Sequence, residues 1–120
     1  MITGGVETIV GMTSDPQFGP LIMFGLGGIY AELIKDTALR LHPLTDLDAS
    51  EMIKSTKMAR LLEGYRGQPP SDIEALKDLL LRLSAMIDDI PQLAELDFNP
   101  VKVLPAGQGY WIADARVMLR

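Results

Sequence analysis

The C-terminal stretch from Leu93 to Leu119, which reads LAELDFNPVKVLPAGQGYWIADARVML, holds the most informative residues of the chain. Its two arms, residues 93–104 and 110–119, alternate apolar and polar side chains over much of their length, as strands with one covered face do. Between the arms lies Pro105-Ala106-Gly107-Gln108-Gly109, whose proline and glycines favour a turn. The stretch therefore predicts a β-hairpin.

Helices are predicted in the middle third of the chain. Ser71-x-x-Glu74 has the pattern of a capping box. Apolar residues then recur along one helical stripe at Ile73, Leu76, Leu80, Leu83 and Ile87, and Pro91 ends the helix. A second capping box, Thr45-x-x-Asp48, opens an earlier helix that continues, with a break, toward Gly64.

The first third predicts strands. Residues 6–10 form a short β-branched run, a turn follows over 14–20, and 21–24 form an apolar run. A glycine loop leads to two further strands at 29–35 and 37–41, although 29–35 also fits a helical turn. Strands, then helices, then strands predict an α+β fold. We expect one domain over residues 1–120, an antiparallel β-sheet packed with two or three helices.

The composition excludes several classes of site and partner. The 120 residues contain no cysteine and one histidine, which excludes disulfides, thiolate metal sites and a His-rich metal site. A net charge of -5 argues against nucleic acid or an anionic membrane as a partner. The sequence has no signal-peptide pattern and no apolar run long enough to span a bilayer, so a cytoplasmic protein is expected.

Polar side chains of the hairpin form a candidate cation site. A turn centred between Ala106 and Gly107 would place Asn99 beside Asp114 and Asp97 beside Arg116, with side chains roughly 5 Å apart. Alternation along the return strand would put Ile112, Asp114 and Arg116 on one face. Oxygen ligands at this spacing suit Mg²⁺. The alternative is a solvated face on which Asp97 and Arg116 form an ion pair.

The glycine loop is a second candidate. Backbone N–H groups of Gly25, Gly27 and Gly28 could bind a phosphate, or these glycines could allow a tight connection or a close backbone approach. Neither the Walker pattern nor the dinucleotide fingerprint is present. Glu7 and Arg66 could each face a ligand or water, and His42 is expected to be structural.

Several strings, in order along almost the whole chain, resemble one family. They are Gly5-Val6-Glu7, Val10-Gly11-Met12, Asp15-Pro16-Gln17-Phe18-Gly19-Pro20, Met23-Phe24-Gly25-Leu26-Gly27-Gly28, Arg40-Leu41-x-Pro43-Leu44, Leu62-Glu63-Gly64-Tyr65-Arg66-Gly67, Pro69-Pro70, Glu95-Leu96-Asp97-Phe98-Asn99-Pro100 and Ala113-Asp114-Ala115-Arg116. The family is the ATP-grasp domain of NDP-forming acyl-CoA synthetases, which include ADP-forming acetate–CoA ligase and are related to succinyl-CoA synthetase. The chain is similar to the C-terminal half of that fold.

The resemblance implies a site as well as a fold. It implies ATP or ADP as the nucleotide, Mg²⁺ bound by Asn99 and Asp114, and a catalytic Asp97 that approaches a phosphohistidine carried elsewhere. The remainder of the ATP-grasp domain and the CoA-binding and phosphohistidine domains are then the expected partners. The isolated chain, interpreted as a fragment, should not turn over. In such a fragment the face that meets the other half of the ATP-grasp domain is exposed, which would allow the chain to form a homo-oligomer.

Two other functions stay open at this point. Similar ATP-grasp regions occur in fusions with protein lysine acetyltransferases, where the acyl-CoA-synthetase-like module is regulatory. The chain could also be a structural half-domain that has lost nucleotide binding.

Overall fold

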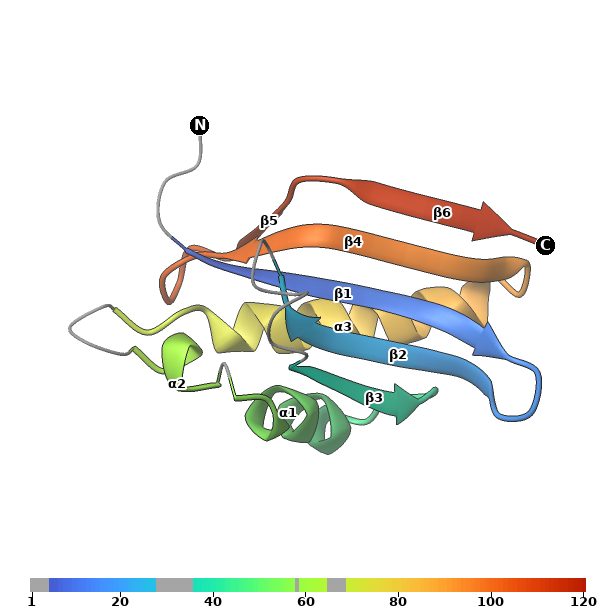
Figure 1. The fold of residues 1–120 in the computed structure, drawn as a ribbon, viewed down its shortest axis with the longest axis horizontal. Helices are drawn as coiled ribbons and strands as arrows, with labels where there is room; N and C mark the ends of the chain where they lie inside the picture. The colour runs from blue at the N-terminus through green and yellow to red at the C-terminus, as the bar shows by residue number, and fades with distance from the viewer. Residues whose placement is uncertain (1–4, 28–35, 58, 65–68) are drawn as a thin grey trace.

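The structure has two layers, an antiparallel sheet and the helices that cover one of its faces (Figure 1). The computed structural model describes residues 5–27, 36–57, 59–64 and 69–120, and the bounds and counts below refer to these. The strands are β1 (Val6–Asp15), β2 (Gly19–Leu26), β3 (Thr37–Leu41), β4 (Leu93–Val103), β5 (Tyr110–Ile112) and β6 (Ala115–Leu119). The helices are α1 (Asp46–Ser55), α2 (Ala59–Leu62) and α3 (Ile73–Asp89). The predicted α+β fold is confirmed.

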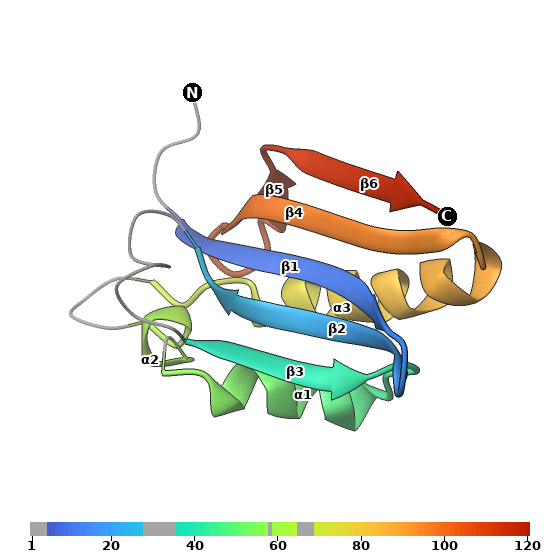
Figure 2. The same ribbon diagram turned by 45° about the vertical axis from the view of Figure 1, so that its right-hand side comes forward.

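The sheet order is β3-β2-β1-β4-β5, and β6 also pairs with β4. β1 and β4 thus occupy the centre, although about eighty residues separate them in the chain. Figure 2 shows from a second angle that α1 and α3 lie on the same side of this sheet. No helix in the described ranges is long and apolar enough to cross a membrane.

The core lies between α3, α1 and the face of the sheet that they cover, which we call the covered face. Val10 of β1, Phe24 of β2 and Val101 of β4 are fully buried there. The predicted stripe of α3 packs against them, because Leu76, Leu80, Leu83 and Ile87 are all buried. Burial of such side chains contributes about 1.5–3 kcal/mol each relative to exposure, so this face carries most of the stability.

The N-terminal hairpin is longer than its sequence predicts. β1 continues past Val10 to Asp15, and β2 already begins at Gly19. The carboxylate of Asp15 accepts hydrogen bonds from the backbone N–H groups of Gln17 and Phe18, at 2.8 and 2.9 Å, which closes the turn within three residues. Gly25 belongs to β2 instead of a loop. The strand expected at 29–35 lies outside the described residues.

The two helix caps differ in how well the sequence predicts them. At α1 the capping box is confirmed: the Thr45 hydroxyl accepts from the Asp48 N–H at 3.1 Å, and the Asp48 carboxylate accepts from the Thr45 N–H at 2.9 Å. At α3 the predicted cap, Ser71, is wrong by one residue, because Asp72 caps the helix by accepting from the Ala75 N–H.

Tertiary contacts explain this shift of the α3 cap. The Ser71 N–H donates to the Leu62 carbonyl at 2.7 Å, and Ser71 forms a β-bridge with Pro105, so its backbone is extended. The Asp72 carboxylate also accepts from the N–H groups of Gly107 and Gly109, at 3.1 and 2.8 Å. The two oxygens of the Asp72 carboxylate accept all three hydrogen bonds at once, whereas a serine hydroxyl has one oxygen with two lone pairs.

The C-terminal hairpin has the predicted register, but its return strand is divided. Val101 pairs with Ile112 and Asp97 pairs with Arg116, as a turn centred between Ala106 and Gly107 requires. Ile112, however, packs against the core together with its partner. The prediction that Ile112 shares a face with Arg116 is therefore wrong.

The reason for this error is a bulge in β4. Against β1, the register shifts between the pairs Thr8–Val101 and Val10–Phe98, so β4 contains one more residue than β1 over this interval. The return strand is likewise interrupted at residues 113–114, between β5 and β6. A bulge changes which residues face which side beyond it, so strict alternation fails there.

Candidate functional site

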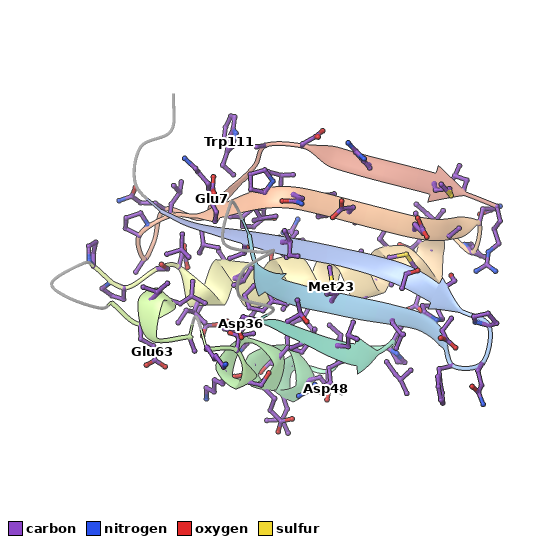
Figure 3. The ribbon with its side chains drawn as sticks, viewed as in Figure 1. Glu7, Met23, Asp36, Asp48, Glu63 and Trp111 are labelled. Atoms are coloured by element: carbon purple, nitrogen blue, oxygen red, sulfur yellow. The ribbon has the colours of Figure 1, made fainter. Side chains whose placement is uncertain are left out.

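A groove of about 490 Å³ lies on the face of the sheet opposite the core, which we call the open face. Its walls come from β1, β2, β3 and β4, and the lining residues are Ile9, Gly11, Met12, Thr13, Met23, Leu39, Glu95, Leu96, Asp97 and Asn99. Met23, labelled in Figure 3, lies near the middle of the sheet on β2. The groove therefore runs across the centre of the open face.

The groove has an apolar side and an acidic side. On β2 and β3 it is lined by Met23 and by Leu39, which is 52% exposed. On β4 it is lined by Glu95, Asp97 and Asn99. Such an arrangement suits a ligand with one apolar and one polar part, because each side of the groove matches one part of it.

Asp97 occupies a central position at the acidic side. It also lines a second hollow of about 400 Å³, formed with Arg116, Val117 and Met118. Asp97 pairs in register with Gly11 on one side and Arg116 on the other. None of the ion pairs found among the described residues joins Asp97 to Arg116. The carboxylate of Asp97 is thus half-buried between two hollows and remains available to a ligand.

The backbones of Asn99 and Asp114 lie side by side, as the predicted hairpin register requires. The Asn99 N–H donates to the Asp114 carbonyl at 3.1 Å, and the neighbouring Ala113 N–H donates to the Pro100 carbonyl at 3.1 Å. Both residues are exposed, and Asn99 lines the groove. The Asp114 carboxylate accepts from the Ala115 N–H at 2.9 Å, which leaves its other oxygen for a ligand.

A magnesium ion at Asn99 and Asp114 would need other ligands as well. Within the described residues, no three His, Cys, Asp or Glu side chains lie close enough to bind a metal by themselves. One amide oxygen and one carboxylate nevertheless fit the way Mg²⁺ is usually bound, with phosphate oxygens and water completing its octahedron. The donor set therefore fits a magnesium ion delivered with a phosphate-bearing ligand.

The glycines predicted for phosphate binding lie close to other backbone. A Cβ on Gly25 would come within 2.8 Å of the Asp36 carbonyl oxygen, and one on Gly27 within 2.9 Å of the Thr8 carbonyl group. These contacts are the close backbone approach considered above, and they account for the absence of side chains. Gly28 and Arg66 lie outside the described residues. Phosphate binding by Gly25, Gly27 and Gly28 stays a prediction.

Sequence reasoning missed the residues of β1, β2 and β3 that line the groove. Ile9 and Gly11 alternate with the buried Val10 and Met12, and this period of two could have indicated an open face. Gly11 permits a close approach, because a Cβ there would lie 2.7 Å from the Leu96 carbonyl oxygen. The close approach of β4 excludes a side chain at position 11, so Gly11 lines the groove beside Asp97 with its backbone alone.

His42 and Glu7 lie apart from this groove lining. The His42 Nε2 lies 3.2 Å from the Ser84 carbonyl oxygen and 3.0 Å from an Asp88 carboxylate oxygen, which is consistent with the structural role predicted for it. Glu7 pairs in register with Lys102, and Figure 3 shows it at the same end of the sheet as Trp111.

Comparison with known proteins gives a family and close relatives. A family model described as an ATP-grasp domain matches residues 1–119. The chain is 50% identical, over 99% of its length, to ADP-forming acetate–CoA ligase I of Archaeoglobus fulgidus. It is 47% identical, over its whole length, to the β subunit of ADP-forming acetate–CoA ligase II of Pyrococcus furiosus.

A solved structure is similar over the full chain. It is acetyl-coenzyme A synthetase 1 of Ca. Korarchaeum cryptofilum in complex with coenzyme A and Mg-AMPPCP, with 47% identity and a TM-score of 0.93. The chain covers 55% of that protein, 51% of the Pyrococcus subunit and 17% of the Archaeoglobus ligase. It thus spans about half the length, or less, of these relatives.

Proposed function

Because the chain belongs to the ATP-grasp domain family, we propose that it is the nucleotide- and magnesium-binding half of the ATP-grasp domain in an ADP-forming acyl-CoA synthetase. The observation that carries the proposal is the acidic side of the open groove, where Asn99 lies beside Asp114 and next to Asp97. The proposed reaction converts an acid, CoA and ATP to acyl-CoA, ADP and phosphate through a phosphohistidine.

The side chains have distinct roles in this proposal. The amide oxygen of Asn99 and the free carboxylate oxygen of Asp114 would hold Mg²⁺. A bound ion would neutralise charge on the phosphate oxygens of the nucleotide. Asp97, between the two hollows, accepts a hydrogen bond from the imidazole N–H of the incoming histidine and so orients the ring.

The apolar side of the groove supports the same proposal. Ile9, Met23 and Leu39 offer a surface on which a planar base can lie, while the phosphates extend toward β4. The described strands would form one side of the nucleotide site, and the proposal includes the remainder of the ATP-grasp domain as the opposite side. It also includes the CoA-binding and phosphohistidine domains, without which the chain should not catalyse synthesis.

Titration of the chain with ADP, followed by NMR of its backbone amides, tests the proposal. We expect the signals of Asn99 and Asp114 to move with ADP and Mg²⁺ and to move much less with ADP in EDTA. Asp114→Asn should weaken the binding of Mg-ADP at least tenfold, because it removes one charged ligand of the ion. The matched control is Asp78→Asn, which removes an acid paired with Arg82 on α3.

Equal Mg-ADP affinity in Asp114→Asn and the native chain would contradict the magnesium site. The regulatory alternative has its own outcome. A protein that combines this chain with the remaining domains, binds Mg-ADP and yet forms no phosphohistidine from ATP would support a sensing module over a synthetase.

A further inference from the structure

Thr8 is a polar side chain buried on the covered face. It lies two residues before Val10 on β1, points to the same side, and is fully buried. Its hydroxyl donates to the Val101 carbonyl of β4 at 2.9 Å. A buried hydroxyl costs free energy unless it is hydrogen-bonded, and the contact with Val101 provides that hydrogen bond. A valine at position 8 would have no hydroxyl to satisfy.

The position of this hydrogen bond coincides with the bulge in β4. Thr8–Val101 is the pair on one side of the register shift, and Val10–Phe98 is the pair on the other. Asn99 and Pro100 are the residues between Phe98 and Val101. The Thr8 hydroxyl therefore holds the carbonyl at the end of the segment that carries Asn99.

Thr8 is itself held in place from the opposite strand. It pairs with Leu26 of β2, and Gly27 beyond β2 lies so close that a Cβ there would be 2.9 Å from the Thr8 carbonyl group. The Gly27 N–H also donates to the Glu7 carbonyl at 3.0 Å. These contacts restrain Thr8 from moving toward β2, so its hydroxyl keeps a fixed position beside the bulge.

We propose that Thr8 is a positioning residue for the Asn99–Asp114 pair. By fixing the Val101 carbonyl, its hydroxyl keeps the extra residue of β4 at Asn99–Pro100 and so presents Asn99 to the groove beside Asp114. The bulge must stay there, because a displacement by one residue turns each side chain to the other face. The part concerning Mg²⁺ rests on the proposed function, while the part concerning the bulge does not.

Two substitutions isolate the hydroxyl. Thr8→Val keeps the β-branched shape but removes the donor to Val101, whereas Thr8→Ser keeps the donor and loses a methyl group. The first measurement is native-state hydrogen exchange of the chain, followed at the Asn99 and Ala113 amides, which bond across the interruption. It needs no ligand.

In Thr8→Val we expect the Asn99 and Ala113 amides to exchange about tenfold faster, with the Leu80 amide of α3 unchanged. Thr8→Ser should exchange at these amides as the native chain does. Unchanged exchange at Asn99 and Ala113 in Thr8→Val would overturn the proposal. Equal acceleration at Leu80 would also overturn it, because that result indicates a general loss of stability without a local role.

The second measurement is the gain in ADP affinity on adding Mg²⁺, taken as the ratio of the dissociation constants in EDTA and in Mg²⁺. Thr8→Val should lower this ratio about tenfold and leave the affinity in EDTA unchanged, while Thr8→Ser keeps both. A ratio in Thr8→Val as high as that of the native chain would overturn the proposed effect of Thr8 on magnesium binding. If the native chain itself shows no gain, the proposed function fails, and hydrogen exchange alone decides the role of Thr8.

Discussion

The two faces of the same sheet have opposite properties. On the covered face Val10, Ile22 and Phe24 are fully buried against α3 and α1. On the open face Leu39 and Leu41 are each 52% exposed, and Asp97 makes no ion pair with its cross-strand neighbour among the described residues. The side chains of the covered face make their contacts within the chain, whereas those of the open face are accessible to a ligand or another domain.

The covered face stabilises the fold, and the open face is the one available for binding. Apolar burial and satisfied polar groups on the covered face stabilise the fold. An exposed apolar surface rimmed by polar residues is typical of a site that binds a ligand or another domain. Substitutions on the covered face should therefore change the free energy of unfolding, and those on the open face should change binding.

The largest expected effect comes from neighbouring residues of β2 that point to opposite faces. Phe24→Ala should lower the free energy of unfolding by about 3–5 kcal/mol, because it empties a fully buried site. Met23→Ala, on the open face, should lower it by less than about 1 kcal/mol. Chemical denaturation of both variants measures the difference. Similar losses in both would remove the distinction between the faces.

Gly11 tests the connection between the faces. Gly11→Ala places a Cβ 2.7 Å from the Leu96 carbonyl oxygen, so β4 must shift next to Asp97. We expect a loss of about 1–3 kcal/mol in unfolding free energy and a displaced Asp97 amide signal in NMR spectra.

The control for this substitution is Gly107→Ala in the hairpin turn. Gly107 has a φ of 86° and no heavy atom within 4 Å of its added Cβ, so its cost of about 1–2 kcal/mol comes from backbone strain alone. It should leave the Asp97 signal in place. An unmoved Asp97 signal in Gly11→Ala would argue against the close approach of β1 and β4.

The smallest expected effect lies at the border of the covered face, in the capping box of α1. Thr45→Ala should lower the free energy of unfolding by about 1 kcal/mol, because it leaves the Asp48 N–H without its acceptor. The hydrogen bond from the Thr45 backbone, with a further one from its side chain, lowers the pKa of Asp48.

A lowered pKa in the folded state fixes the sign of the pH dependence. Asp48 contributes to the free energy of unfolding above its unfolded pKa of about 4, and this contribution is lost as the pH falls through its pKa in the folded state. Thermal unfolding at a series of pH values should therefore show a smaller acid-induced decrease in Tm for Asp48→Asn than for the native chain. An identical decrease in both would contradict the assigned cause.

Local features of this fold could be predicted from sequence. The amphipathic stripe of α3, the Thr45–Asp48 box and the register of the C-terminal hairpin depend on residues close to one another in the chain. The turn residues around Gly107 set which positions face each other, so the sequence alone places Asn99 beside Asp114. The family strings indicated the same pair.

Other features depended on residues far apart in sequence. Asp72 replaces Ser71 as the cap of α3 because its carboxylate also reaches the hairpin turn, 35 and 37 residues away. The groove exists because β1, β2 and β3 lie beside β4, an order that no local pattern contains.

Near neighbours in the chain specify the helices, the turns and the facing pairs of the C-terminal hairpin, so these features could be predicted from the sequence. The position of the bulge in β4, and with it the face that Ile112 occupies, depends on tertiary contacts. The bulge arises where β4 pairs with β1. The hydrogen bond from Thr8 to Val101 joins residues 93 apart, and the pairing of β1 with β4 brings them together.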